Sequence, residues 1–104
     1  MQIEISEAGS AATVKLVGRL DISGAEVIAL PLATVSGNKN TVIIEMDGVT
    51  FIASIGLRHL TSAAKAVGRR GGRVILRNPR TAVTDVITTS GLADFFVIEV
   101  EREP

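Results

Sequence analysis

TVIIEMDGVTFIASIGLRHL, residues 41–60, is the stretch that decides the fold. Its contiguous β-branched residues, Val42–Ile44, are typical of a strand that is buried on both faces in a sheet covered by helices. Asp47 and Gly48 are expected to break this strand, since both residue types favour turns. A short apolar segment follows, and then Ser54 stands where a helix is expected to begin. That helix should run from about residue 55 to residue 67, because apolar residues recur along it at helical spacing.

The position of Ser54 allows two interpretations. Serine is a good N-cap, because its hydroxyl can accept a hydrogen bond from a backbone N–H that the first turn leaves unpaired. The same geometry also suits an anion. We expect free N–H groups at Ile55, Gly56 and Leu57, and the helix dipole adds a partial positive charge. Ser54 is therefore either a plain cap, which is the commoner role, or a phosphate acceptor.

The remaining segments alternate between strand and helix patterns. Residues 2–6 and 13–17 alternate with period two and predict a hairpin. Ser23–Glu26 has the spacing of a capping box, and the helix that follows contains Pro31, near which we expect a kink or a division into two pieces. A strand at 73–77, a helix that starts at Asn78-Pro79 and a last strand at 95–100 complete the chain.

This element order, β-β-α-β-α-β-α-β, predicts one α/β domain with a mixed sheet of four or five strands. The strands that helices connect should be parallel, because a helical crossover carries the chain back to the end of the sheet at which the preceding strand began. Such crossovers are right-handed. The loop before Ser54 and the turn at 21–23 both end a strand and start a helix. We therefore expect them to meet at one edge of the sheet.

Composition narrows the function classes. The chain has 104 residues and no net charge, and aromatic residues make up only 3% of it, with neither tryptophan nor tyrosine. Stacking on single-stranded nucleic acid is thus disfavoured, and helix-turn-helix spacing is lacking. The absence of cysteine excludes disulfides and thiolate metal sites. There is no apolar run long enough to cross a bilayer and no signal peptide, so a cytoplasmic location is expected.

Enzymatic and ligand-binding functions have weak support. Ser54 and His59 point to different sides of the expected helix, and the nucleophile motif G-x-S-x-G lacks its first glycine. We expect neither a cofactor nor a metal. Arg58–Arg80 contains seven basic residues and no acid. This basic stretch is either a solvated surface or a small-ligand or nucleotide site that uses Arg69 and Arg73.

The surface beside Ser54 favours a protein partner. Val49, Phe51, Ile55 and Leu57 are expected to form an apolar lip there. Phosphorylation of Ser54 would add about 1.5–2 negative charges to the contact. Such a charge could switch binding off without changing the fold.

The stretch DGVTFIASIGL, residues 47–57, resembles the motif of STAS domains, and most closely that of the small free-standing bacterial anti-sigma factor antagonists. In that family an apolar strand leads to an aspartate, a short apolar loop and then Asp-Ser-x-Gly-Leu at the start of a helix. Gly18–Asp21 (GRLD) resembles a second motif of the family. The element order is similar to the family's over about residues 2–100.

The resemblance implies a phosphorylation-switched protein-binding module and no enzymatic activity. The unphosphorylated antagonist binds an anti-sigma factor that is also a serine kinase and holds the ATP, and the sigma factor is released. The kinase phosphorylates the serine that Ser54 matches, binding is lost, and a phosphatase resets the system. Asp21 matches an aspartate that lies near this serine and helps recognition or phosphorylation.

The acid that usually precedes the serine is Ala53 here, which would weaken kinase recognition or mark a branch with a different partner. The expected partner-binding residues are Asp21, Asp47, Val49, Phe51, Ala53, Ile55, Gly56 and Arg58. The alternative is an accessory or scaffold STAS subunit, stressosome-like or associated with lipid transport. In that role Ser54 would be a structural helix cap.

Overall fold

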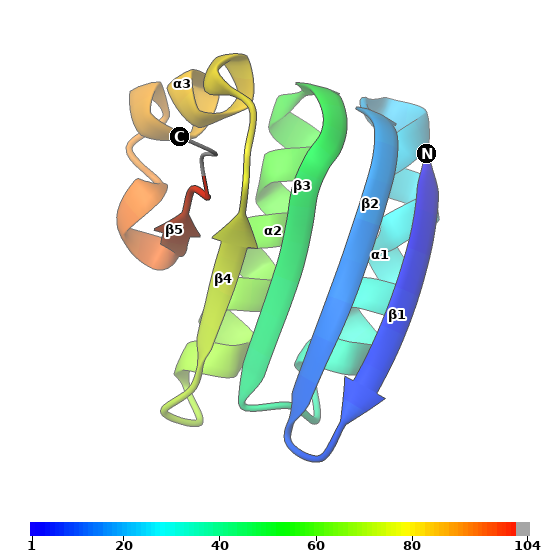
Figure 1. Cartoon of the computed structure of the whole chain (residues 1–104), viewed down its shortest axis with the longest axis vertical. Coiled ribbons are helices and arrows are strands. Elements are labelled where there is room, and N and C mark those ends of the chain that lie inside the picture. Colours follow the sequence, from blue (N-terminus) through cyan, green and yellow to red (C-terminus); the bar gives the residue numbers. More distant parts are fainter. Residues whose placement is uncertain (102–104) are drawn as a thin grey trace.

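A computed structural model, which describes residues 1–101, shows a five-stranded mixed sheet packed against helices (Figure 1). The elements are β1 (Gln2–Ala8), β2 (Ala11–Leu20), α1 (Ile22–Ser36), β3 (Thr41–Ile52), α2 (Ser54–Gly68), β4 (Arg73–Arg77), α3 (Thr81–Thr89), the 3₁₀ helix η1 (Ala93–Phe95) and β5 (Val97–Glu99). The predicted fold class and element order are confirmed.

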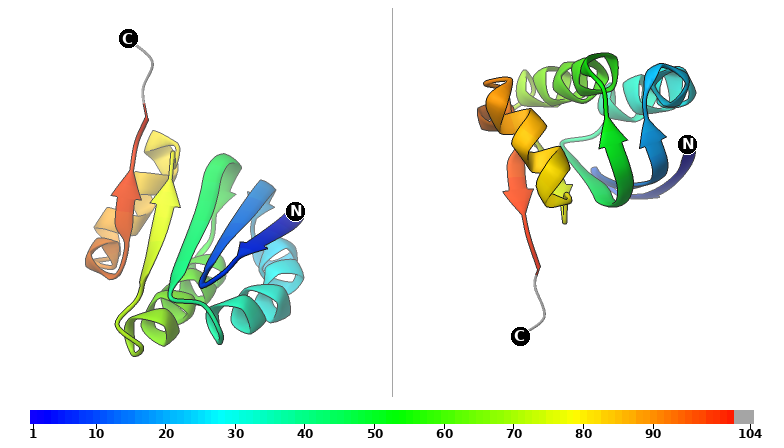
Figure 2. Two further views of the ribbon diagram at one scale, coloured as in Figure 1. Left: turned by 60° about the horizontal axis from the view of Figure 1, so that its bottom comes forward. Right: turned by 90° about the horizontal axis from the view of Figure 1, so that it is seen from above.

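The strands lie in the sheet in the order of the sequence, β1-β2-β3-β4-β5. β1 and β2 form the predicted antiparallel hairpin, and the β2–β3, β3–β4 and β4–β5 pairs are all parallel. The parallel pairs follow from the helical connections, because a crossover returns the chain to the same end of the sheet. α1 and α2 lie side by side against one face of the sheet, and α3 lies beyond the end of β4 (Figures 1 and 2).

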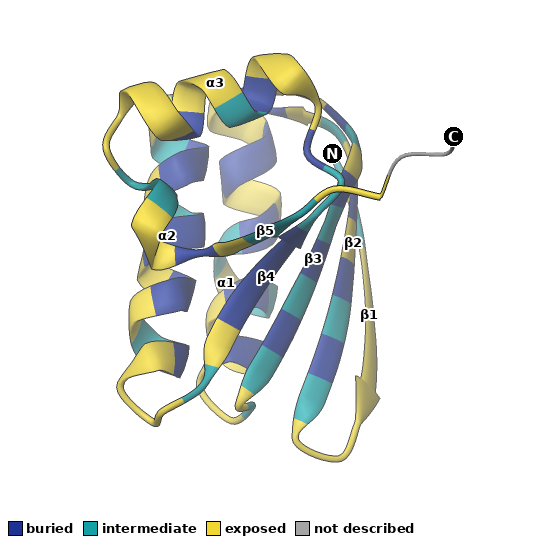
Figure 3. Ribbon diagram, turned by 60° about the vertical axis from the view of Figure 1, so that its left-hand side comes forward, coloured by how far each residue is buried: buried dark blue, intermediate teal, exposed yellow. Residues whose placement is uncertain are grey.

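Because both long helices cover the same face, the core lies on one side of the sheet. In β3, Val42, Ile44 and Met46 are fully buried, whereas Ile43 and Glu45 on the opposite face are only half-buried (Figure 3). The expectation of a strand buried on both faces is therefore wrong. Each fully buried aliphatic side chain stabilises such a core by about 1.5–3 kcal/mol.

β3 continues through Asp47 and Gly48, which we had expected to end it. Lys15 pairs with Glu45 but Val17 pairs with Gly48, so β3 accommodates one extra residue opposite β2. This is a β-bulge, which keeps the strand paired while it re-aims the side chains beyond it. Glycine fits here because a Cβ on Gly48 would lie 3.0 Å from the Leu16 carbonyl oxygen.

The helix starts also differ from the expectations. Asp21 is the N-cap of α1, and its Oδ1 accepts a hydrogen bond of 2.9 Å from the Gly24 N–H, so the capping box at Ser23 is wrong. Pro31 lies inside one continuous helix, so the predicted division of this helix into two pieces is wrong. α3 begins at Thr81, while Asn78 has a φ of 53° and its Oδ1 accepts a bond from the Glu101 N–H.

The last strand is shorter than predicted. β5 covers only Val97–Glu99, since Ala93–Phe95 forms the 3₁₀ helix η1. The buried Phe96 then packs on the core between these two elements.

Candidate functional site

The ends of β2 and β3 meet where α1 and α2 begin. Leu20 pairs with Ile52, and the Ala53 N–H donates a 2.9 Å hydrogen bond to the Leu20 carbonyl. Asp21 follows the first strand end and Ser54 the second. The predicted meeting of these two turns at one sheet edge is confirmed. We call Arg19, Asp21, Phe51, Ser54 and Arg58 the Ser54 surface.

Ser54 is the first residue of α2 and is exposed. The N-cap position belongs to Ala53, which has extended backbone angles and a methyl side chain with no hydrogen-bonding group. The interpretation of Ser54 as the helix cap is therefore wrong. Its hydroxyl projects from a helix start whose first backbone N–H groups have no partner within the helix.

The N–H of Leu57 is not one of these groups. It donates a 3.0 Å hydrogen bond to the Ala53 carbonyl, which closes the first turn. The N–H groups at the helix start are thus those of Ser54, Ile55 and Gly56. They carry the positive end of the dipole of α2, which favours an anion on the Ser54 oxygen.

Gly56 fixes how closely α2 approaches the sheet. A Cβ added there would lie 2.5 Å from Leu20 Cγ and 2.9 Å from the Leu20 carbonyl oxygen. Gly56 is buried, so the close approach that it permits is to β2 within the chain. The prediction that Gly56 contacts a partner is therefore wrong. Gly56 instead positions Ser54 at the sheet edge.

Arg19, Phe51 and Asp21 form a connected group beside the start of α1. The Arg19 guanidinium carbon lies 4.3 Å from the centre of the Phe51 ring, and Arg19 Nε lies 3.6 Å from Asp21 Oδ2. The N–H of Gly24 and the nearby Arg19 charge lower the pKa of Asp21. Asp21 is therefore ionised at neutral pH. Phe51 is 40% exposed despite its contact with Arg19.

A hollow of about 320 Å³ lies between α2 and α3 next to Ser54. Arg58 and Lys65, the charged residues of this lining, are both on α2. The full lining is Ser54, Leu57, Arg58, Thr61, Ser62, Lys65, Val86, Ser90 and Leu92. An anion at Ser54 would therefore sit beside a cationic hollow as well as at a helix N-terminus.

Two members of the expected apolar lip lie in the core. Val49 is 0% exposed and Leu57 is 3% exposed, so neither can form a surface lip. Phe51 is exposed, and Ile55 and Ala53 are half-buried. The register shift between Lys15 and Val17 explains the burial of Val49, because it moves the inward positions of β3 from even to odd numbers. Leu57 is one of the buried residues of α2.

Asp47 does not line the hollow beside Ser54. It is exposed, its carbonyl accepts a 2.9 Å hydrogen bond from Arg80 Nε, and it lines a different hollow together with Asn78 and Pro79. Sequence reasoning did not select Arg19 or Ile22 as site residues, although Arg19 belongs to the GRLD motif and Ile22 directly follows Asp21. Ile22 is 70% exposed at the start of α1 and adds apolar area near Asp21.

The basic stretch does not form one site. Arg70 donates to the carbonyls of Ser36, Lys39 and Ala66 and so ties the end of α1 to α2. Arg77 Nε bonds Glu99 Oε1 at 3.2 Å. These arginines have structural contacts on separate elements, which leaves Arg58 and Lys65 as the basic side chains beside Ser54.

Comparison with known proteins places this geometry in a family. The STAS domain family model matches residues 2–103. No curated protein sequence gives a significant match. No helix in residues 1–101 has the length and apolar character needed to cross a membrane.

Three solved structures are similar in fold. The anti-sigma factor antagonist SpoIIAA in its unphosphorylated form is 24% identical, with a TM-score of 0.82 over 98% of this chain and 90% of that one. The phosphorylated form of SpoIIAA from Bacillus is 23% identical, with a TM-score of 0.77 over 98% and 93%. An anti-sigma factor antagonist from Mycobacterium paratuberculosis is 22% identical, with a TM-score of 0.77 over 94% and 84%.

Proposed function

The chain belongs to the STAS domain family, and we propose that it is an anti-sigma factor antagonist whose partner binding is switched by phosphorylation of Ser54. One observation carries the proposal: the Ser54 hydroxyl is exposed at the first residue of α2 and does not cap the helix. The partner is an anti-sigma factor that is also a serine kinase, and a phosphatase reverses the modification. The protein acts in the cytoplasm as a binding module and not as an enzyme.

The partner docks on the Ser54 surface. Phe51 offers an exposed aromatic ring with the Arg19 cation over it, and Arg58 offers a second cation on the hollow beside Ser54. Aromatic and arginine side chains dominate the binding energy of protein interfaces. Ala53, Ile55 and Asp21 complete the contact, and the exposed Ile22 extends its apolar part beside Asp21.

A phosphoryl group on Ser54 fits this chain without refolding. The start of α2 supplies backbone N–H groups and the dipole, and Arg58 lies one turn further along the helix on the same hollow. The modification adds about 1.5–2 negative charges at the centre of the docking surface. A partner would have to desolvate this charge to bind, so affinity falls while the fold remains.

Ala53 changes the electrostatics of the switch. A carboxylate before the serine would repel a phosphate, and alanine removes that repulsion. Asp21 is then the acid at this sheet edge, held at the N-terminus of α1 by the Gly24 N–H. We infer that the kinase of this chain recognises Asp21 and does not need an acid at position 53.

Two forms of SpoIIAA, phosphorylated and unphosphorylated, have this fold, which supports a switch without a change of fold. The alternative role is an accessory or scaffold subunit; only the part of it that makes Ser54 the helix N-cap is contradicted, because Ala53 holds that position.

The test is a phosphorylation assay with the cognate anti-sigma kinase and ATP, read by mass spectrometry of the intact protein. We expect one phosphoryl group on the wild type and on Ser62→Ala, and none on Ser54→Ala. Ser62 is the matched control, because it is an exposed serine on the same helix and lines the same hollow. Modification that persists in Ser54→Ala would remove Ser54 from this role.

A further inference from the structure

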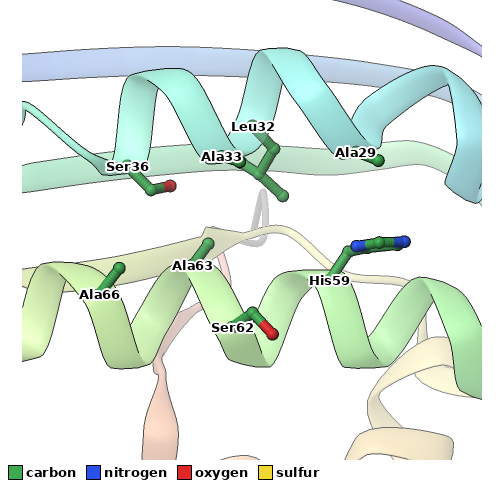
Figure 4. A pocket seen from close by; sticks show the side chains of 8 residues that line it. All are labelled: Ala29, Leu32, Ala33, Ser36, His59, Ser62, Ala63 and Ala66. Atoms are coloured by element: carbon green, nitrogen blue, oxygen red, sulfur yellow. The ribbon is translucent and has the colours of Figure 1, made fainter.

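α1 has one covered flank and one open flank. The covered flank faces α2 through Ala29, Ala33 and Ser36, and the buried Ser36 hydroxyl has no hydrogen-bond partner within residues 1–101 (Figure 4). The open flank lies over β1, the strand at one edge of the sheet (Figure 1). It carries Leu30, which is 75% exposed, and Val27, which is 43% exposed. α1 therefore presents apolar side chains to solvent on the side where the sheet ends.

A hollow of about 490 Å³ lies between this open flank and β1. Ile5, which is 37% exposed, lines it from the strand, and Leu30 and Pro31 line it from the helix. The full lining is Ile5, Glu7, Leu30, Pro31, Thr34, Val35 and Asn38. Glu26 is the single charged residue of α1, and a helix that is apolar all round is normally buried. We call Ile5, Val27, Leu30 and Pro31 the β1 flank.

β1 also has backbone groups that its hairpin leaves free. Ala8 and Ala11 close a two-residue turn and so form a hydrogen-bonded pair. Such pairs alternate along an antiparallel ladder, so every second residue counted from Ala8 bonds to β2. The residues between them, Ile3, Ile5 and Glu7, direct their N–H and C=O groups to the edge, where no other strand of residues 1–101 lies. An edge of this kind is a template for pairing with a further strand.

We propose that a second copy of this chain binds the β1 flank and that the two β1 strands pair antiparallel about a two-fold axis at Ile5. In this register Ile5 lies opposite Ile5 of the second copy, and Ile3 lies opposite Glu7. The residues with free backbone groups thus face one another, and each such pair exchanges two hydrogen bonds. The sheet of one copy then continues into the sheet of the other.

The charges of β1 select this register. Glu4 lies opposite Ser6, so no two carboxylates face each other directly. A shift by two residues in one direction would pair the two Glu4 side chains, which is destabilising, and in the other direction it would take Ile3 out of the ladder. Glu7 is compatible with the contact because its Oε1 lies 3.3 Å from Lys39 Nζ, which offsets its charge.

The two α1 helices come into contact in the same arrangement. α1 contacts both β1 and β2. Because neighbouring strands are about 4.8 Å apart, a helix midway between β1 and β2 lies about 10 Å from its copy across the axis. Packed helices are separated by about 8–10 Å, so the spacing fits direct contact. Leu30 borders the hollow beside Ile5, close to the axis, and its side chain enters the hollow of the second copy.

The size of the contact suits a reversible dimer. The seven residues of β1 make an edge about 23 Å long, and a sheet with one helix layer is about 20 Å thick. Such a flank buries on the order of 500–700 Å² from each copy, at the lower end for specific interfaces, so we expect a micromolar Kd. The two Ser54 surfaces lie at opposite ends of the joined sheet and remain free. The dimer therefore does not depend on the proposed phosphorylation switch.

The first experiment is sedimentation velocity of the purified full chain from about 5 to about 500 µM, where a micromolar dimer should change from mostly monomer to mostly dimer. Leu30→Glu should weaken the dimer at least about tenfold, because it places two carboxylates near the axis in place of two apolar side chains. Its Tm should stay close to that of the wild type, since Leu30 is exposed. Ile22→Glu is the matched control, because Ile22 is 70% exposed on the same helix but lies outside the β1 flank. It should leave the Kd within about twofold.

The second experiment tests the register by oxidative cross-linking. The chain contains no cysteine, so an introduced thiol can pair only with its own copy. Hydrogen-bonded antiparallel residues have Cα atoms about 5.5 Å apart, which suits a disulfide, so Ile5→Cys should form a covalent dimer. Glu7→Cys is the control, because the two copies of residue 7 lie about 13 Å apart along the strands in this register. It should remain monomeric on a denaturing gel.

Three results would overturn the proposal. The first is a wild-type protein that stays monomeric over the whole concentration range. The second is a Leu30→Glu protein that dimerises with the wild-type Kd. The third is a Glu7→Cys protein that cross-links as fast as Ile5→Cys, since that would require a different arrangement of the two copies.

Discussion

Replacing Gly56 by alanine tests how the start of α2 is seated on the sheet. The added Cβ would lie 2.5 Å from Leu20 Cγ, 2.9 Å from the Leu20 carbonyl oxygen and 3.1 Å from Leu20 Cδ2. Carbon atoms in favourable contact are about 3.5–4.0 Å apart, so the two groups must separate by about 1 Å. Leu20 is 0% exposed and its carbonyl accepts from the Ala53 N–H, so neither atom can move freely.

The magnitude follows from two opposing terms. Overpacking a core costs about 1–3 kcal/mol, and contact with a fixed backbone oxygen places Gly56→Ala in the upper part of that range. Alanine returns about 1 kcal/mol of helix propensity. We therefore expect a net loss of about 1–2 kcal/mol in the free energy of unfolding, which lowers the Tm by about 4–15 °C for a domain of this size.

The assay is denaturant unfolding of the purified variant, followed by far-ultraviolet circular dichroism. Gly68→Ala is the matched control, since it lies in the same helix and a Cβ there has no atom of residues 1–101 within 4 Å. Gly68→Ala should match the wild type or exceed it by up to about 1 kcal/mol. A Gly56→Ala protein as stable as the wild type would refute the close seating of α2 on Leu20.

Three further predictions concern single side chains. Asp21→Asn should lower the Tm at neutral pH: the folded-state pKa of Asp21 lies below its ordinary value of 3.8, so its contribution is present above that value and is lost as the pH falls through the lower pKa. Thermal melts from pH 7 to pH 2 should show the wild type and Asp21→Asn converging at the acid end, and a constant difference would contradict the charge assignment. Arg70→Ala should cost about 1–2 kcal/mol in urea unfolding, because it removes hydrogen bonds to three carbonyls. Arg69→Ala, an exposed neighbour, should stay within about 0.5 kcal/mol, and equal effects would argue against the tie between α1 and α2. Phe51→Ala should leave the Tm within a few degrees, since its contact with Arg19 is worth about 0.5–1 kcal/mol, but should weaken partner binding at least about tenfold by calorimetry. Unchanged affinity would exclude Phe51 from the docking surface.

Periodicity was sufficient to predict the layout of the fold. The period-two segments gave the hairpin, and the apolar stripes gave helices between parallel strands, because burial of one face dictates both patterns. The meeting of Asp21 and Ser54 followed from the same topology. These features depend only on which residues are apolar and in what order the elements occur.

The errors arose where tertiary pairing overrode local propensity. Asp47 and Gly48 favour a turn by themselves, but pairing with β2 holds them in a bulge. The inward positions of β3 therefore change from 42, 44 and 46 to 49 and 52, which buries Val49. No local pattern specifies where such a register shift occurs.

Capping and cavities were beyond sequence reasoning for a related reason. Asp21 and Ser23 are both good caps, and Ser54 is a better one than Ala53 by residue type. The choice was set by the Leu20–Ala53 hydrogen bond, which fixes where each strand ends. The unpaired hydroxyl of Ser36 likewise depends on how α1 packs against α2, which the amino-acid pattern does not encode.

The most direct test of the account is the affinity of the anti-sigma partner for the unphosphorylated protein and for the Ser54-phosphorylated protein, measured by calorimetry alongside the Tm of each form. We predict nearly equal melting temperatures and an affinity at least about tenfold lower after phosphorylation, which corresponds to about 1.4 kcal/mol or more of lost binding free energy. Equal affinities of the two forms, with the phosphate verified on Ser54, would contradict the phosphorylation switch.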